Sequence, residues 1–131
     1  MEMKNELQLV TYEQAQILKK LCFDWTSMYY YNNYGDLMRN YGLANHNSNK
    51  LNSFINSFSA PSAALALKWC RDEKGLVSSV NQVQMLGKSS SKYTFSHNNQ
   101  YGCYFGENTY DTYEHAESAL LDNILTFLEK Q

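Results

Sequence analysis

Histidines and cysteines are the residues of this sequence best suited to chemistry. His46, His97 and His115 stand far apart, and none lies at the spacing of a metal-binding motif. We therefore expect surface or turn histidines and no metal site.

Three cysteines are spread over the chain at Cys22, Cys70 and Cys103, with no Cys-x-x-Cys pair. This spacing favours reduced, partly buried thiols in a cytoplasmic protein over a disulfide or a metal site. Cys103 with His97 is conceivable as a nucleophile and its base. Because Cys103 sits in a strand of alternating aromatic residues, we expect it to be a small, inward-facing apolar residue instead.

Residues 87–89, Gly-Lys-Ser, resemble the end of a phosphate-binding loop. The motif needs an earlier glycine at position 82, which is Gln82, and a strand rather than a helix is expected to follow. We therefore reject this motif.

Four carboxylates lie near aromatic segments, but nothing in the sequence pairs them for general acid and base catalysis. They are Asp24, Asp36, Glu107 and Asp111. Together with the preceding points, this predicts a protein that is not an enzyme, with no catalytic residue and no cofactor.

The length and composition predict one folded domain over residues 1–131. The chain is 44% hydrophobic and 15% aromatic but only 18% charged, and 11 of its residues are tyrosines. A net charge of −2 argues against a protein that binds nucleic-acid phosphates mainly through its overall charge. No apolar run approaches the ~20 residues of a membrane span, and no signal peptide is recognisable, so we expect a cytoplasmic location. Residues 1–8 are expected to be disordered, and residues 40–53 to form a loop.

The central element is an alanine-rich helix within residues 59–76. Pro61 is expected at its first position, with Ser59 or Ala60 as the cap, and Gly75 as its end. Trp69 falls on the apolar stripe and is expected in the core rather than on a binding surface.

Two further helices share the entry Thr-Tyr-Glu-x-Ala. Thr11 caps the first, with Gln14 in capping-box position, and this helix is expected to stop around residues 22–24. Thr112 begins the last helix, whose apolar residues repeat every 3.6 positions to about Glu129.

The β-rich part of the chain follows the central helix. Residues 76–86 form a first strand, and two alternating strands follow around an Asn98-Asn99-Gln100 loop. A three-residue loop would set Tyr93 opposite Phe105 and Phe95 opposite Cys103. We thus predict an α+β fold: a three-stranded antiparallel meander packed against about three helices, with an extension of the sheet by N-terminal strands left open.

The segment between the first two helices is rich in tyrosine and asparagine. Residues 28–31 and 51–58 are expected to be short strands. Tyrosine with asparagine is typical of adaptable protein-binding surfaces. The candidate binding residues are Tyr29, Tyr30, Tyr31, Tyr34, Arg39 and Tyr41. The bland interpretation is that these rings only cover the core.

From Ser59 to Gln131 the order helix, three strands, helix matches that of double-stranded RNA-binding domains. In those domains a basic start of the last helix contacts phosphate. Here that start carries Asp111, Glu114 and Glu117, which repel phosphate. A shared topology therefore does not imply a shared function.

Several stretches, in order along most of the chain, resemble a group of small uncharacterised proteins of Bacteroidetes phages and prophages. They are Thr-Tyr-Glu-Gln-Ala at 11–15, Tyr-Tyr-Tyr at 29–31, Ser-Ala-Pro-Ser at 59–62 with Lys-Trp-Cys-Arg at 68–71, and Tyr-Asp-Thr-Tyr-Glu-His-Ala at 110–116. In that group the first helix commonly ends in Lys-Gly-Phe-Asp, whereas Cys22 replaces the glycine here. The resemblance implies an accessory protein of a mobile element, with no functional residue.

The leading hypothesis is a module that binds a protein partner or itself. The alternative is nucleic-acid binding, with the tyrosines at 29–41 stacking on bases and Arg39, Lys88 and Lys92 contacting phosphate.

Overall fold

The computed structural model describes residues 7–40, 57–84 and 91–131, excluding the side chains of 84 and 91. In these ranges the helices are α1 (Tyr12–Lys20), α2 (Ala63–Lys74) and α3 (Tyr113–Glu129). The strands are β1 (Tyr29–Tyr31), β2 (Leu37–Arg39), β3 (Phe58–Ser59), β4 (Val77–Gln84), β5 (Ser91–Asn99) and β6 (Gly102–Phe105). The loop predicted at 40–53 falls outside the described residues apart from Asn40, and the disorder predicted at 1–8 apart from Leu7 and Gln8.

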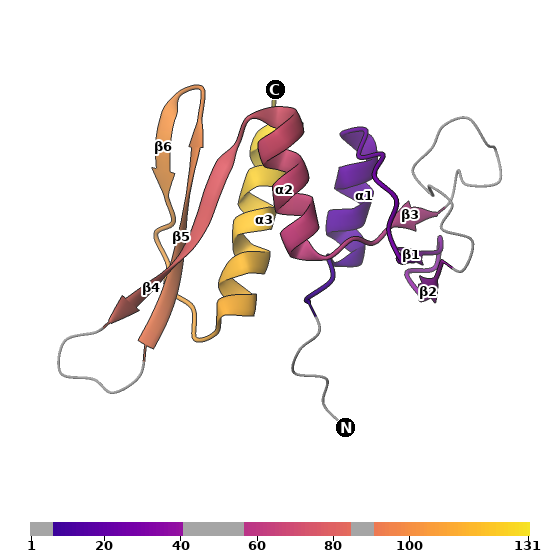
Figure 1. Ribbon diagram of the computed structural model, residues 1–131, viewed down its shortest axis with the longest axis horizontal. Coiled ribbons are helices and arrows are strands. Elements are labelled where there is room, and N and C mark those ends of the chain that lie inside the picture. The colour runs from indigo at the N-terminus through magenta and orange to yellow at the C-terminus, as the bar shows by residue number, and fades with distance from the viewer. Residues whose placement is uncertain (1–6, 41–56, 85–90) are drawn as a thin grey trace.

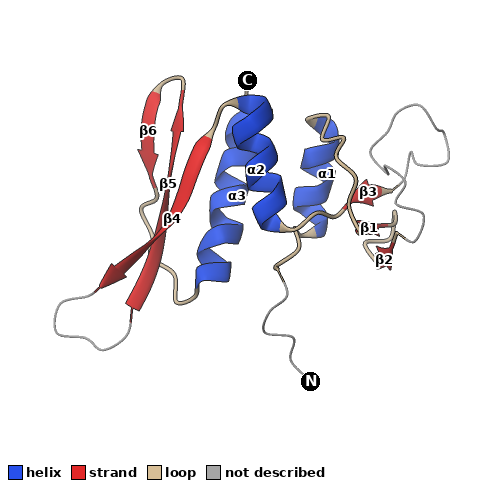
Figure 2. Ribbon diagram, viewed as in Figure 1, coloured by secondary structure: helices blue, strands red, loops and turns tan. Residues whose placement is uncertain are grey.

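The architecture is α+β, as predicted. The described strands form two antiparallel sheets, one ordered β2-β1-β3 and the other β4-β5-β6. The three helices lie between them, with α3 next to the larger sheet and α1 next to the smaller one (Figure 1). Figure 2 shows the two sheets in red at opposite ends of the helical layer. The N-terminal strands therefore build a sheet of their own and do not extend the meander.

Helix α1 begins with the predicted capping box. The Thr11 hydroxyl accepts from the backbone of Gln14 at 3.1 Å, and the Gln14 side chain accepts from the backbone of Thr11 at 2.9 Å. Val10 and Ala15, on either side of the cap, are both buried in the core.

The end of α1 is a tight stop built around a residue that is not glycine. Cys22 adopts φ 70°, the left-handed conformation that glycine prefers. Its N–H donates to Lys19 at 3.1 Å, and the N–H of Phe23 donates to Leu18 at 2.9 Å. These two bonds form a Schellman motif, and Leu18 and Phe23 are both fully buried. The cysteine thus takes the backbone conformation of the glycine that it replaces.

Helix α2 starts later than predicted. Ser62, not Ser59 or Ala60, is the N-cap, and its hydroxyl accepts from Leu65 at 3.1 Å. Ser62 can act as the cap because its hydroxyl accepts a hydrogen bond from a free N–H group at the start of the helix. The side chains of Ala60 and Pro61 contain no acceptor, so Pro61 lies before the cap. Gly75 ends the helix with φ 72°, as predicted.

The β5–β6 hairpin has a different register from the predicted one. Asn99 pairs with Gly102, which leaves two loop residues instead of three. The Asn99 side chain accepts from the backbone of Tyr101 at 2.8 Å, and Gly102 adopts φ 123°, which few other residues tolerate. This local turn chemistry favours the shorter loop.

The observed register differs from the predicted one by an odd number of residues. Each side chain of β6 therefore points to the opposite face of the sheet from the one predicted. Tyr104 shares the helix-facing side with His97, and their rings stack with centroids 5.2 Å apart. Cys103, predicted to face inward, is exposed, and Phe105 is 70% exposed. The predicted pairs of Tyr93 with Phe105 and of Phe95 with Cys103 do not form.

The hydrophobic core lies where the three helices meet. Trp69 of α2 is buried, as predicted, and its ring contacts Phe23 edge to face at 5.4 Å. Helix α3 contributes Leu120, Leu121, Ile124 and Leu125, all fully buried. The apolar stripe read from the sequence of the last helix is thus the centre of the molecule.

Candidate functional site

The six candidate binding residues do not form one surface. Tyr29 and Tyr31 alternate with Tyr30 along β1, so Tyr30 points to the opposite face of the small sheet. Tyr34 lies in the β1–β2 turn and is 83% exposed. Tyr41 lies outside the described residues.

Tyr31 belongs to the scaffold. Its hydroxyl donates to the Val10 carbonyl at 2.6 Å, and its ring contacts that of Tyr12 at 5.6 Å. Burial, with a smaller contribution from the Glu13 carboxylate, raises the pKa of Tyr31. The bland interpretation, a ring that covers the core, holds for this residue.

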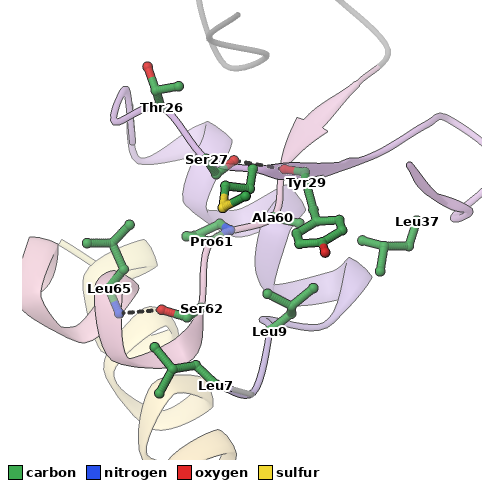
Figure 3. Close-up of a pocket in the computed structure, with 11 residues that line it drawn as sticks. Leu7, Leu9, Thr26, Ser27, Tyr29, Leu37, Ala60, Pro61, Ser62 and Leu65 are labelled. Atoms are coloured by element: carbon green, nitrogen blue, oxygen red, sulfur yellow. Dashed lines mark hydrogen bonds between the residues drawn. The ribbon is translucent and has the colours of Figure 1, made fainter. Parts of the chain in front are cut away.

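Tyr29 lies at an apolar pocket of about 510 Å³ between the small sheet, the segment before α1 and the start of α2. Figure 3 shows Tyr29, Leu37, Leu9 and Leu65 around this space. The pocket is lined by Leu7, Leu9, Thr26, Ser27, Met28, Tyr29, Leu37, Ala60, Pro61, Ser62 and Leu65. None of these side chains is charged.

Backbone pairing holds one wall of the pocket. Leu9 forms an antiparallel bridge with Ser62, next to a bond of 3.0 Å from Val10 to the Pro61 carbonyl. The N–H of Ala63 donates to the Gln8 carbonyl at 2.7 Å. Pro61 suits this position because its missing N–H is not needed by α2, which starts after it.

The opposite wall is held by a small polar network. The Ser27 hydroxyl donates to the Tyr29 carbonyl at 2.8 Å, and the buried amide of Asn40 donates to the Ser27 carbonyl at 3.0 Å. Asn40 also donates its backbone N–H to Met28 at 2.8 Å, which continues the β1–β2 ladder. Both walls are therefore positioned before anything binds.

Three apolar side chains at the pocket remain open to solvent. Leu7 is 68% exposed, Met28 54% and Leu37 46%. Contiguous apolar surface in a hollow is typical of an interaction site, whereas single exposed apolar residues are ordinary. The Arg39 guanidinium lies 5.8 Å from the centre of the Tyr29 ring and is the charged group associated with this face.

The residues considered for catalysis are not brought together. His97 is buried, and its Nε2 lies 2.8 Å from Oδ1 of Asn123. Cys103 pairs with Asn98, so its side chain lies on the other face of the sheet from His97. Among the described residues no three histidine, cysteine or acidic side chains are grouped as metal ligands. His46 and Lys88 lie outside that part of the chain.

The larger sheet with α2 and α3 has the predicted order helix, three strands, helix. At the start of α3, Lys92 forms an ion pair with Asp111, and Glu114 is exposed. Burial, opposed by a hydrogen bond from Gln8, raises the pKa of Glu117. The surface that would face phosphate in a double-stranded RNA-binding domain is acidic here.

The sequence interpretation missed the leucines of the pocket. Leu7 and Leu9 alternate across Gln8, a pattern of a short strand, but the predicted disorder at residues 1–8 includes Leu7 and Gln8. Leu37 belongs to β2, a three-residue strand too short to recognise.

Comparison of the chain with protein-family models, with curated proteins and with solved structures finds no match. Across the described ranges, no helix combines the length and the apolar character that a membrane span requires.

Proposed function

We propose that this chain is a small, non-enzymatic protein-interaction module, and that the apolar pocket beside Tyr29 receives apolar side chains of a partner protein. The proposal rests on one observation: the apolar pocket of about 510 Å³ has no charged side chain in its lining, and three of its apolar side chains are partly exposed to solvent. Burying such surface against a partner is favourable by about 25 cal/mol per Å².

The chemistry of the lining supports a protein ligand over a reaction. The Ser27 hydroxyl is engaged with a backbone carbonyl, and the Ser62 hydroxyl caps α2. Both serines therefore serve the scaffold, and most of the remaining lining is apolar, which favours recognition by shape and apolar contact.

The resemblance to Bacteroidetes phage and prophage proteins supports the biological setting that we propose, a cytoplasmic accessory protein of a mobile element. In that setting the partner is a host or phage protein.

The test compares affinity capture by the wild-type chain with capture by Leu37→Lys, which places a charge at the pocket. Tyr34→Lys, in the exposed β1–β2 turn, is the matched control because it adds the same charge outside the pocket. We expect one or more proteins to be captured by wild type and by Tyr34→Lys but not by Leu37→Lys. Titration of each purified partner by calorimetry then confirms direct binding. Equal binding of the partner to all three chains would exclude the pocket.

Nucleic-acid binding ranks second because the order of α2, β4, β5, β6 and α3 favours it while the charges oppose it. Its test is a titration with single- and double-stranded oligonucleotides at low ionic strength. Binding that weakens steeply with salt, and that is lost in Arg39→Gln, would move this function to first place.

A further inference from the structure

Among the described strands, β4 is an edge of the larger sheet. In the order β4-β5-β6 it pairs with β5 on one side only. Its eight residues, Val-Ser-Ser-Val-Asn-Gln-Val-Gln, contain no charge and no proline, the features with which edge strands usually prevent pairing with another chain.

The hydrogen bonds of β5 show which groups of β4 point outward. Tyr93 exchanges two backbone bonds with Tyr110, and the Phe95 carbonyl accepts from Gly106 at 2.8 Å. The backbones of Tyr93 and Phe95 therefore face away from β4, and the alternate residues of β5 bond to it.

The residues of β5 that bond to β4 are the even-numbered ones, and Ser96 pairs with Ser79 and Thr94 with Asn81. The odd-numbered residues of β4 are therefore the ones whose backbone groups bond to β5. The N–H and C=O groups of Ser78, Val80 and Gln82 consequently point to the free edge. No hydrogen-bond partner for these backbone groups occurs in the described part of the chain.

The second half of this edge is accessible. Helix α2 lies beside the first half of β4, across a hollow of about 200 Å³ lined by Ala64, Lys68, Ser78 and Val80 among others. The second half of β4 projects beyond the helical layer (Figure 1). Asn81 and Gln82 are exposed.

We propose that a second copy of this chain adds its own β4 to this edge, antiparallel, about a twofold axis at Asn81. In this register Val80 lies opposite Gln82 of the second copy, and Ser78 opposite Gln84. Each outward residue then exchanges both backbone hydrogen bonds, and the two sheets become one of six strands.

A second copy fits because the strand is complementary to itself. Its length matches by definition, and because the strand carries no charge, pairing two copies of it sets no like charges opposite each other within the sheet. The edge belongs to the larger sheet and Tyr29 and Leu37 of the pocket to the smaller one, and these two sheets lie at opposite ends of the helical layer (Figure 2). The dimer and the proposed partner protein therefore use different strands.

The first test uses proline at an outward position. Gln82→Pro removes an N–H that faces the free edge, so the bonds of β4 to β5 remain. Gln82→Thr is the control, because threonine keeps the N–H and suits a strand. We expect sedimentation equilibrium to show a monomer–dimer system for wild type and Gln82→Thr and a monomer for Gln82→Pro, all with the same circular dichroism. A wild-type chain that stays monomeric at the highest soluble concentration overturns the proposal, as does a Gln82→Pro chain that still dimerises.

The second test locates the axis. In a background of Cys22→Ser and Cys103→Ser, Asn81→Cys places two thiols opposite each other, at a Cα separation of about 4.5 Å that a disulfide can bridge. We expect mild oxidation to give a covalent dimer of this variant and none of Asn98→Cys, an exposed position on β5. Equal cross-linking of the two variants, or none for Asn81→Cys in a sample that sediments as a dimer, excludes this register.

Discussion

The side-chain amide of Gln14 donates a hydrogen bond of 2.7 Å to the carboxylate of Asp122 and so joins the first turn of α1 to the middle of α3. The same side chain completes the capping box with Thr11, and its amide also donates to the Ser118 carbonyl at 3.1 Å. Gln14 is almost fully buried. One polar residue therefore both starts a helix and holds two elements that are distant in sequence.

Gln14→Glu tests this link because glutamate still accepts from Thr11 but cannot donate to Asp122. We expect a loss of about 2–3 kcal/mol in the free energy of unfolding at neutral pH, because the variant buries a carboxylate at position 14, loses the hydrogen bonds to Asp122 and Ser118, and sets two carboxylates against each other. The repulsion raises the pKa of one acid, so the loss shrinks as the pH falls. Urea unfolding at several pH values measures this, with Gln16→Glu on the same helix as control. Equal losses for both variants would contradict the role of Gln14.

Cys22→Gly should stabilise the protein. Cys22 holds φ 70°, which costs a residue with a side chain about 1–2 kcal/mol and glycine almost nothing. Part of the gain is offset by the greater freedom of glycine in the unfolded chain, so we expect a net rise of about 0.5–1 kcal/mol. Thermal and urea unfolding measure it. Cys22→Ala, which keeps the strain, should show no such rise, and a similar gain for both would point to the thiol instead.

Gly75→Ala should have the opposite effect at the end of α2. A Cβ at this position would meet no atom within 4 Å, so the expected loss of about 1 kcal/mol arises from the backbone at φ 72° alone. Chemical denaturation gives the value. Gly75→Asn, whose side chain tolerates this conformation better, should lose less than Gly75→Ala.

The three thiols should differ in reactivity. Burial raises the pKa of Cys70 to about 12, whereas Cys22 and Cys103 are exposed. Because the thiolate is the reactive form, we expect a thiol reagent to modify two cysteines in the folded protein and the third only on unfolding. Mass spectrometry of the labelled peptides identifies them. Rapid labelling of Cys70 in the native protein would contradict its place in the core.

Glu117→Gln should change how stability depends on pH. Burial raises the pKa of Glu117 above its ordinary value of 4.5, so the folded chain holds this proton more tightly than the unfolded chain. As the pH rises above 4.5, Glu117 must lose this proton, so the free energy of unfolding that its protonated form contributes is lost. We expect Glu117→Gln to be more stable than wild type at neutral pH, with a difference that narrows toward the lower end of that window. Glu129→Gln, exposed at the end of α3, is the control, and a constant difference between Glu117→Gln and wild type across pH would refute the assignment.

Several features could be predicted from the sequence because they depend on short stretches of chain. Each of these features depends on residues three or four positions apart: the caps at Thr11 and Thr112, the end of α2 at Gly75, and the apolar stripe of α3. A helix end needs particular side chains at fixed offsets, so the signal is complete in one turn. The α+β class followed from the order of such elements.

The pocket could not be predicted, because its walls come from three separate segments. Leu9, Leu37 and Leu65 are unremarkable in sequence, and only backbone pairing between residues 8–10 and 61–63 brings them to one place. The tyrosines were visible as a cluster, but strand alternation divided them between two faces and placed Tyr31 against the core.

The sequence by itself determined that α1 begins at Thr11 and α3 at Thr112, that α2 ends at Gly75, and which helical residues are apolar. Only the tertiary structure decided that the described strands form two sheets, that β5 and β6 pair in the register that exposes Cys103, and that β4 pairs with β5 alone among the described strands. The physical reason is the distance along the chain over which each feature is set. Helix caps and helical periodicity depend on residues within one turn of each other. Strand pairing, register and pockets depend on contacts between segments that are far apart in sequence.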